Sequence, residues 1–273
     1  MTAVITLTTD FGLSDAYVAA MKGVMLGINP EAKLVDICHT IEPQNIRQAA
    51  FVLSTAYSFF PAGTTHLVVV DPGVGTERRG IILRTPSASF VAPDNGVLSY
   101  VIAQSSARPV KTKQQQLKLE PGLEAVAITN PGFWRSPVSP TFHGRDIFAP
   151  VAARLSLGAP PSDFGAAVTS VTMLPIFHPC RAPDGTLVGH ILHIDNFGNL
   201  ITNISSRDLP PAKQAINIEV GRHTISGLSC TYAEGSGLLA LIGSSGYLEI
   251  ALKDGKASTL LDAGVGNEIK LRL

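Results

Sequence analysis

The sequence has few charged residues, few aromatic residues and no long hydrophobic run. Only 15% of its 273 residues are charged, against an average of about 25% in soluble proteins. The 21 basic and 21 acidic residues balance and form no basic stripe, which argues against a nucleic-acid surface. No apolar run reaches the roughly 18 residues that a membrane-spanning helix needs. Because so few residues are charged, we expect part of the surface to be buried between subunits and predict a homo-oligomer. We expect no nucleic-acid or membrane partner.

Cysteine is scarce as well. Cys38, Cys180 and Cys230 are scattered along the chain and form no CxxC pair. This predicts free, buried thiols in a reducing compartment, with no disulfide or zinc framework. The first ten residues, MTAVITLTTD, lack the basic stretch of a signal peptide, so we expect a cytoplasmic protein.

The sequence also lacks the motifs of the common nucleotide and metal sites. The turn Gly73-Val74-Gly75 is not followed by Gly-Lys-Ser/Thr, and no GxGxxG follows the first predicted strand. Nucleoside triphosphates, dinucleotides and a Rossmann methyltransferase are therefore disfavoured. His190 and His193 would face opposite sides of a strand, without a third ligand nearby. We expect no cofactor and no metal.

The first half of the chain alternates predicted strands and helices at the spacing of right-handed βαβ units. Ser14 is expected to cap the first helix, and Pro43 to open the second. The predicted strands are residues 4–8, 33–37, 66–70, 80–84, 89–92 and 123–129, and the predicted helices run to residue 28 and over 43–59, 96–104 and 146–157.

The pattern changes after Gly158. Residues 159–184 are rich in proline and show no clear periodicity. Short β-rich segments separated by glycine follow, with predicted strands at 187–194, 216–220, 238–242, 247–252 and 268–273. These segments are typical of a small barrel or sandwich. We predict an α/β N-terminal domain with a mostly parallel central sheet (1–158), a proline-rich linker (159–186) and a small all-β, barrel-like C-terminal domain (187–273).

Two acids follow predicted strands of the first half. Asp71 ends the strand in LVVVDPGVGTER (67–78), and Asp10 follows the first strand. In an open α/β sheet, ligands bind beyond the carboxyl ends of the strands. Arg78 returns seven residues after Asp71 and can complete a site, whereas Asp10 could accept hydrogen bonds from the two hydroxyls of a ribose. Either acid could instead cap backbone amides in a tight turn.

Three further segments contain candidate residues. His143 lies in a polar run just before a predicted helix, where it could exchange protons at neutral pH or simply cap and pack. Asp195, Phe197 and Asn199 follow a predicted strand and could stack on and hydrogen-bond an adenine, or form a hairpin turn. The run GSSG (243–246) is either a turn or a site for a carboxylate.

Six segments, in this order, resemble the S-adenosyl-L-methionine (SAM) hydroxide adenosyltransferases, the adenosine-forming SAM hydrolases related to fluorinase and chlorinase. The resemblance extends from residue 5 to about residue 257. It implies hydrolysis of SAM to adenosine and L-methionine, and a homotrimer that holds the ligand between the first domain of one subunit and the second domain of its neighbour. The segments are TTDFGLSDAYVAAMKG (8–23), DPGVGTERR (71–79), APDNGVL (92–98), TFHGRDIFAPVAARL (141–155), IDNFGNLITN (194–203) and GSSGYLEIA (243–251).

The resemblance also implies roles for single residues. The family's catalytic Asp, Arg and His correspond to Asp71, Arg78 and His143, and its ribose-binding acid corresponds to Asp10. The other substrate-binding positions that it implies are Asp195 for the methionine amine, Phe197 and Asn199 for the adenine, Ser244 near the methionine carboxylate, and Asn95 in the third segment.

Several positions depart from the halide-using relatives. This sequence has His143-Gly144 where the fluorinase has Tyr-Ser, and this pair suits water rather than halide. Ser245 stands where the fluorinase has Arg, and Gln44 where it has Trp. A halide-using SAM transferase and a non-catalytic SAM- or adenosine-binding module are the alternatives. Whether Asp71 or His143 accepts the proton of water stays open at this point.

Overall fold

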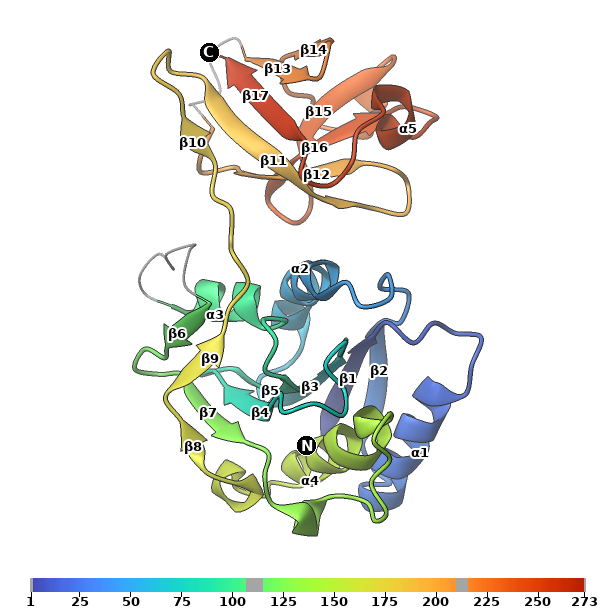
Figure 1. The fold of residues 1–273 in the computed structure, drawn as a ribbon. Coiled ribbons are helices and arrows are strands. Elements are labelled where there is room, and N and C mark those ends of the chain that lie inside the picture. Colours follow the sequence, from blue (N-terminus) through green and yellow to red (C-terminus); the bar gives the residue numbers. More distant parts are fainter. Residues whose placement is uncertain (1, 107–114, 210–215, 273) are drawn as a thin grey trace. The chain divides into compact units, whose positions relative to one another are not determined.

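The chain forms two compact units, Met1–Ile176 and Phe177–Leu273 (Figure 1). The computed structural model describes residues 2–106, 115–209 and 216–272. The boundary between the units falls inside the stretch predicted as a linker, which contains the 3₁₀ helix η4 (Pro161–Phe164) and the short strands β8 (Ala167–Val168), β9 (Ser170–Thr172) and β10 (Cys180–Arg181).

A seven-stranded sheet forms the centre of the first unit, in the order β2-β1-β3-β5-β4-β7-β8. The first four strands of this order are parallel, and the other three join antiparallel. This confirms the predicted α/β class with parallel strands at its centre. The strands are β1 (Val4–Thr9), β2 (Lys33–Cys38), β3 (Thr64–Val69), β4 (Gly80–Arg84), β5 (Ala88–Pro93) and β7 (Glu124–Ala127), and a separate strand β6 (Gln116–Lys118) pairs with β9.

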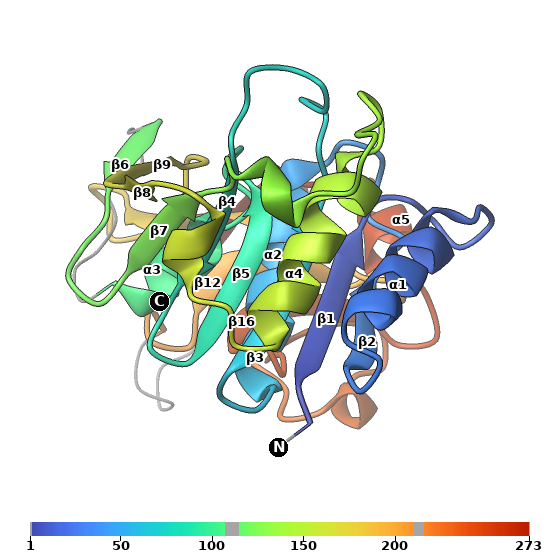
Figure 2. The same cartoon turned by 90° about the horizontal axis from the view of Figure 1, so that it is seen from below.

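Helices cover both faces of this sheet (Figures 1 and 2). The helices α1 (Tyr17–Ile28) and α4 (Ala149–Ser156) lie on one face, and α2 (Ile46–Ala56) and α3 (Ser99–Ser105) on the other. Met21 and Met25 of α1, four residues apart, are fully buried in the core beneath it, as expected for one face of an amphipathic helix. Across the described ranges, every helix is too short or too polar to cross a lipid bilayer.

Two helix starts differ from the prediction. Helix α1 begins at Tyr17, and the residue before it, Ala16, makes no side-chain cap, so Ser14 is not the cap. Helix α2 begins at Ile46, capped by the Asn45 side chain. Gln44 has a φ of 66°, outside the helical region, and this keeps Pro43 out of the helix.

The last residues of the first unit bind back onto its sheet. β8 pairs with β7 at the sheet edge. Beyond β8, Thr172 N donates to Asp94 Oδ1 at 2.7 Å and Leu174 N donates to Ser99 Oγ at 2.8 Å. The first unit therefore includes chain as far as Ile176.

Antiparallel strands form the second unit, in the order β14-β13-β17-β11-β12-β16-β15, with β10 also beside β11. The end strands β14 and β15 contact each other, and Ser229 N, three residues after β14 ends, donates to Ala240 O of β15. The sheet is thus nearly closed, as the barrel-like prediction expected. Its elements are β11 (Leu187–Ile194), β12 (Leu200–Ser205), β13 (Asn217–Val220), β14 (His223–Ser226), β15 (Leu238–Ile242), β16 (Tyr247–Leu252), α5 (Ala257–Leu261) and β17 (Glu268–Arg272).

The three cysteines are free thiols, as predicted. The expectation that they are buried is wrong. Cys38 is half-buried, and Cys180 and Cys230 are exposed, because the first ends an edge strand, the second lies in a two-residue strand and the third lies in a loop.

Candidate active site

Polar residues meet where the parallel strands β1 and β3 end. These strands are neighbours, with Thr9 opposite Val69, so Asp10 and Asp71 leave the sheet at the same edge. A cavity of about 350 Å³ opens there. The side chains that line it include Asp10, Phe11, Tyr17, Asp71, Phe142 and His143.

Arg78 joins Asp71 to His143. Its Nε donates to Asp71 Oδ1 at 2.8 Å and Oδ2 at 2.9 Å, and its Nη2 also donates to Oδ2. The same Nη2 lies 3.1 Å from His143 Nδ1, and the guanidinium lies 5.0 Å from the centre of the Phe148 ring. Only 5% of the Asp71 side chain and 14% of that of Arg78 are exposed, so solvent screens this ion pair weakly.

The contact with Arg78 determines which nitrogen of His143 carries a proton. A guanidinium can only donate, so Nδ1 must accept and the neutral ring carries its proton on Nε2. Burial lowers the pKa of His143, the Arg78 charge lowers it further, and the charges of Asp71 and Asp146 oppose both. His143 is therefore a neutral Nε2–H donor at neutral pH.

A glycine allows the loop that carries Arg78 to touch the segment that leads to His143. Gly75, in the loop from Asp71 to Arg78, has a φ of 77°, and a Cβ there would lie 2.6 Å from Pro140 O. Both the left-handed backbone and the close approach require glycine. This contact brings Arg78 to a histidine 65 residues further along the chain.

A buried carboxylate holds the loop that carries His143. The backbone after His143 is π-helical over Gly144–Phe148, a distortion that is frequent at functional sites. Within it, the fully buried Asp146 accepts hydrogen bonds from Arg145 (2.7 and 2.8 Å), from Arg135 (2.9 Å) and from Ser139 N (2.9 Å). The Arg145 hydrogen bonds are the main cause that lowers the pKa of Asp146 to about 2, so Asp146 stays ionised and ties residues 135–146 together.

Asp10 lies across the cavity, beside three aromatic rings. Its Oδ2 accepts a hydrogen bond from Gln44 N at 2.8 Å. Phe11, Tyr17 and Phe142 form a cluster with ring centres 5.2–5.8 Å apart. The site thus combines a carboxylate with an apolar wall, which suits a ligand that has both hydroxyl groups and an apolar part.

Asn95 supports the strand end rather than lining the cavity. Its Nδ2 donates to Val70 O at 2.9 Å and its Oδ1 accepts from Val97 N at 3.1 Å. The first contact holds the segment that leads to Asp71, and the second lies within the turn of Asn95 itself. As a substrate contact, Asn95 stays a prediction.

The second unit contains the remaining predicted residues, in loops beside its sheet. Asp195 Oδ1 accepts from the backbone N of Phe197 and of Asn199, both at 2.9 Å, and Oδ2 accepts from Asn199 Nδ2 at 3.0 Å. This closed turn leaves the Phe197 ring 73% exposed. Ser244 is exposed in the turn between β15 and β16.

Two residues that the sequence analysis missed interact with Asp195. Tyr232 Oη donates to Glu249 Oε1 at 2.5 Å, and Glu249 is only 5% exposed. Burial, and to a smaller extent the charge of Asp195, raise the pKa of Glu249. Burial is also the main cause that raises the pKa of Tyr232 to about 12. The available signal was a single charge inside the apolar strand YLEIAL (247–252).

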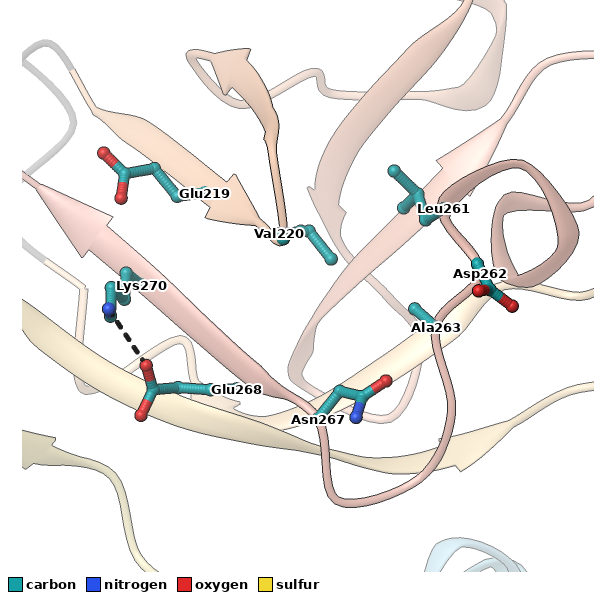
Figure 3. A pocket seen from close by; sticks show the side chains of 9 residues that line it. Glu219, Val220, Leu261, Asp262, Ala263, Asn267, Glu268 and Lys270 are labelled. Carbon is teal, nitrogen blue, oxygen red and sulfur yellow. Dashed lines mark ion pairs between the residues drawn. The ribbon is translucent and has the colours of Figure 1, made fainter.

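A second cavity, of about 400 Å³, lies beside β13 and β17 (Figure 3). Three of the four charged side chains that line it are already in ion pairs. Lys270 Nζ lies 3.1 Å from Glu268 Oε1, the dashed contact in Figure 3, and Glu219 pairs with Arg272 at 3.0 Å. Because these charges satisfy one another, this cavity is a weaker candidate than the one beside Asp71.

Comparisons with known proteins extend over both units. Residues 5–165 match the SAM hydroxide adenosyltransferase N-terminal domain, and residues 189–270 match the C-terminal domain. An (R)-S-adenosyl-L-methionine hydrolase from Salinispora tropica is 37% identical over 98% of this chain and 97% of its own length. A fluorinase from Nocardia brasiliensis is 28% identical over 98% of this chain and 97% of its own. The crystal structure of an uncharacterized conserved protein from Thermotoga maritima has a TM-score of 0.86 and 36% identity, over 99% of this chain and 100% of that one.

Proposed function

The chain belongs to the SAM hydroxide adenosyltransferase family, and from this premise we propose that it is a hydrolase that converts SAM to adenosine and L-methionine. The observation that carries the proposal is the contact of one guanidinium with both Asp71 and His143 beside a cavity. Such an arrangement can hold and activate a water molecule. The hydrolase from Salinispora tropica supports it more closely than the fluorinase, at 37% against 28% identity.

At C5′ the reaction makes one bond and breaks one, and the attacking water loses a proton to a base. The oxygen of water attacks the ribose C5′, and the C5′–S bond breaks with its electron pair on sulfur, so methionine leaves as a neutral thioether. A sulfonium needs no general acid to leave. Water, with a pKa of about 15.7, is a poor nucleophile unless a base takes its proton. Catalysis therefore depends on activating water and aligning it with the C5′–S bond.

We assign Asp71 as the base that takes the proton of the attacking water. His143 already carries a proton on Nε2, so it can donate to the water oxygen but cannot accept from it in this tautomer. An ionised carboxylate offers about four lone-pair directions, of which Arg78 uses three, so one is left for water. Arg78 contacts both Asp71 and His143 and so fixes their relative positions. Its positive charge stabilises the hydroxide that develops as water loses its proton.

In this proposal, the substrate contacts residues of the first unit and residues of the second unit. Asp10 accepts the ribose hydroxyls in the first unit. In the second unit, Phe197 and Asn199 bind the adenine, Asp195 the methionine amine and Ser244 the region of the carboxylate.

The homotrimer, with sites built from two subunits, and the cytoplasmic location also belong to this proposal. Two observations support an assembly of subunits. Only 15% of the residues are charged, and each unit exposes an aromatic ring near its candidate residues: Tyr17 is 50% exposed and Phe197 is 73% exposed. Rings of this size are favourable to bury against a partner.

Incubation with SAM and chromatography of the products tests the reaction. The wild-type protein should form adenosine and methionine in equal amounts. In water enriched in oxygen-18, the label should enter the adenosine 5′-hydroxyl. Parallel reactions with chloride and with fluoride should give no 5′-halogenated nucleoside. If a halogenated product forms instead, the protein is a halide transferase, and if SAM binds without turnover, it is a binding module.

A further inference from the structure

Glu249 lies on the side of β16 that faces away from the barrel core. Its neighbours along the strand, Leu248 and Ile250, belong to the core. Strand residues alternate between faces, so Glu249 points to the opposite face. It is nevertheless only 5% exposed, and Tyr232, from the loop between β14 and β15, donates to it.

Two predicted substrate loops converge on this carboxylate. Glu249 lies opposite Ile201 on β12. Asn199, directly before β12, donates to Asp195, and the charge of Asp195 acts on Glu249. On the other side, Glu249 Oε2 lies so close to Gly243 that a Cβ there would clash with it. Gly243 begins the turn that carries Ser244.

Among the residues that the structure describes, no cation pairs with the carboxylates of Asp195 and Glu249. Glu249 Oε1 accepts from Tyr232, while Oε2 accepts no hydrogen bond from the described residues. In the same ranges, neither Asp195 nor Glu249 forms an ion pair with Lys, Arg or His. A largely buried carboxylate is costly unless a cation or a proton neutralises it. This arrangement therefore favours a positively charged group from outside the unit.

We propose that Glu249, positioned by Tyr232, is a specificity-determining residue that binds the α-ammonium group of the substrate together with Asp195. The inference rests on the proposed function, since it takes SAM as the ligand. The ammonium group distinguishes SAM from adenosine, which has no cationic group. Asp195 has already accepted three hydrogen bonds within its own turn, so Oε2 of Glu249 is the less occupied acceptor.

Calorimetry with three ligands tests this role. The ligands are SAM, the analogue in which hydrogen replaces the α-ammonium, and adenosine. Glu249→Gln should weaken SAM binding about 10- to 100-fold, while the affinities for the analogue and for adenosine stay unchanged. In steady-state assays, KM for SAM should rise and kcat should change little. Glu268→Gln, which removes a carboxylate of the second cavity, is the matched control and should alter none of these values.

Two results would overturn the inference: equal weakening of SAM and of the analogue in Glu249→Gln, or unchanged binding of SAM. If Glu249→Gln does not fold, Tyr232→Phe keeps the ring and removes the hydrogen bond. It should cause a smaller loss that is still selective for SAM, and a loss without selectivity overturns the inference. The wild type separates this test from the proposed function: selectivity for SAM over the analogue without adenosine formation would refute hydrolysis and leave the role of Glu249 standing.

Discussion

At the scale of the residue, the donors of Arg78 give Asp71 and His143 different parts in the proposed mechanism. One guanidinium contacts both a carboxylate and an imidazole. Because it can only donate, the imidazole must accept at Nδ1 and keeps its proton on Nε2. The position of Arg78 thus determines the tautomer of His143.

Substitution of His143 and Asp71 tests these roles. A glutamine amide can donate from a position near that of Nε2, so His143→Gln should retain about tenfold more activity than His143→Ala. Asp71→Asn keeps the shape but cannot take a proton, and it should lose about 10²- to 10⁴-fold in kcat. Initial rates of adenosine formation measure all three. Equal inactivity of His143→Gln and His143→Ala, with substantial activity in Asp71→Asn, would make the imidazole the base.

The pH profile should report the environment of His143. Burial and then Arg78 lower its pKa, so the acid limb of kcat/KM should lie below pH 6.5. Below that limb, a proton on Nδ1 would break the contact with Arg78. Asp146 raises the pKa of His143, so Asp146→Asn should move the limb to lower pH. Asp163→Asn, an exposed acid in η4, is the control, and a limb that moves to higher pH in Asp146→Asn would contradict the electrostatic effect.

At the scale of the element, the site depends on two loops that touch at one point. Arg78 and His143 are 65 residues apart in sequence, and the segments that carry them meet where Gly75 lies against Pro140 O. The π-helix that follows is tied back through Asp146. The distance between Arg78 and His143 is therefore determined by loop packing.

Gly75→Ala should separate the two loops. The new Cβ would be strained at a φ of 77° and would clash with Pro140 O, which should cost about 1–3 kcal/mol of unfolding free energy. Most activity should be lost as well. Gly122→Ala is a matched control, because its φ is 96° and nothing lies within 4 Å of the new Cβ. Urea denaturation and initial rates measure both variants. If Gly75→Ala is as active as Gly122→Ala, the contact between the loops does not position the site.

The sequence predicted the long apolar elements well and the short ones poorly. Strands β11, β15 and β16 have the bounds that their apolar runs predicted. The strands β8 and β9 have only two and three residues, too few for a period to show. The start of α2 was misplaced because Gln44 forms a turn whose backbone N binds Asp10, a contact 34 residues away in sequence.

The sequence predicted those parts of the candidate site whose residues are close together in the chain. Asp71 and Arg78 lie in one loop, so their spacing alone suggested a pair, and the ion pair is present. The resemblance to a family, rather than any local pattern, joined His143 to them. Glu249 was missed because its environment depends on Tyr232, which comes from another loop.

At the scale of the whole molecule, the proposed site needs residues from both units. Asp10 and the proposed catalytic residues belong to the first, and Asn199 to the second. If the trimer combines units from different subunits, two differently disabled chains should rescue each other.

Mixing Asp10→Ala subunits with Asn199→Ala subunits tests the assembly. After dissociation and reassociation, some sites combine the intact first unit of an Asn199→Ala chain with the intact second unit of an Asp10→Ala chain. The mixture should recover activity in proportion to the number of these sites. Each variant alone should stay impaired. A pulldown with two different tags verifies that the subunits exchange, and exchange without recovery of activity would place the complete site within one chain.

The return of residues 167–174 to the first sheet has a practical consequence for protein production. A fragment ending at Gly158 would leave β7 as an uncovered edge, and Asp94 and Ser99 would lose the backbone donors of Thr172 and Leu174. Uncovered strand edges pair with other chains and promote aggregation. A fragment ending at Ile176 keeps these contacts, so a truncated protein that contains only the first unit should end at this residue.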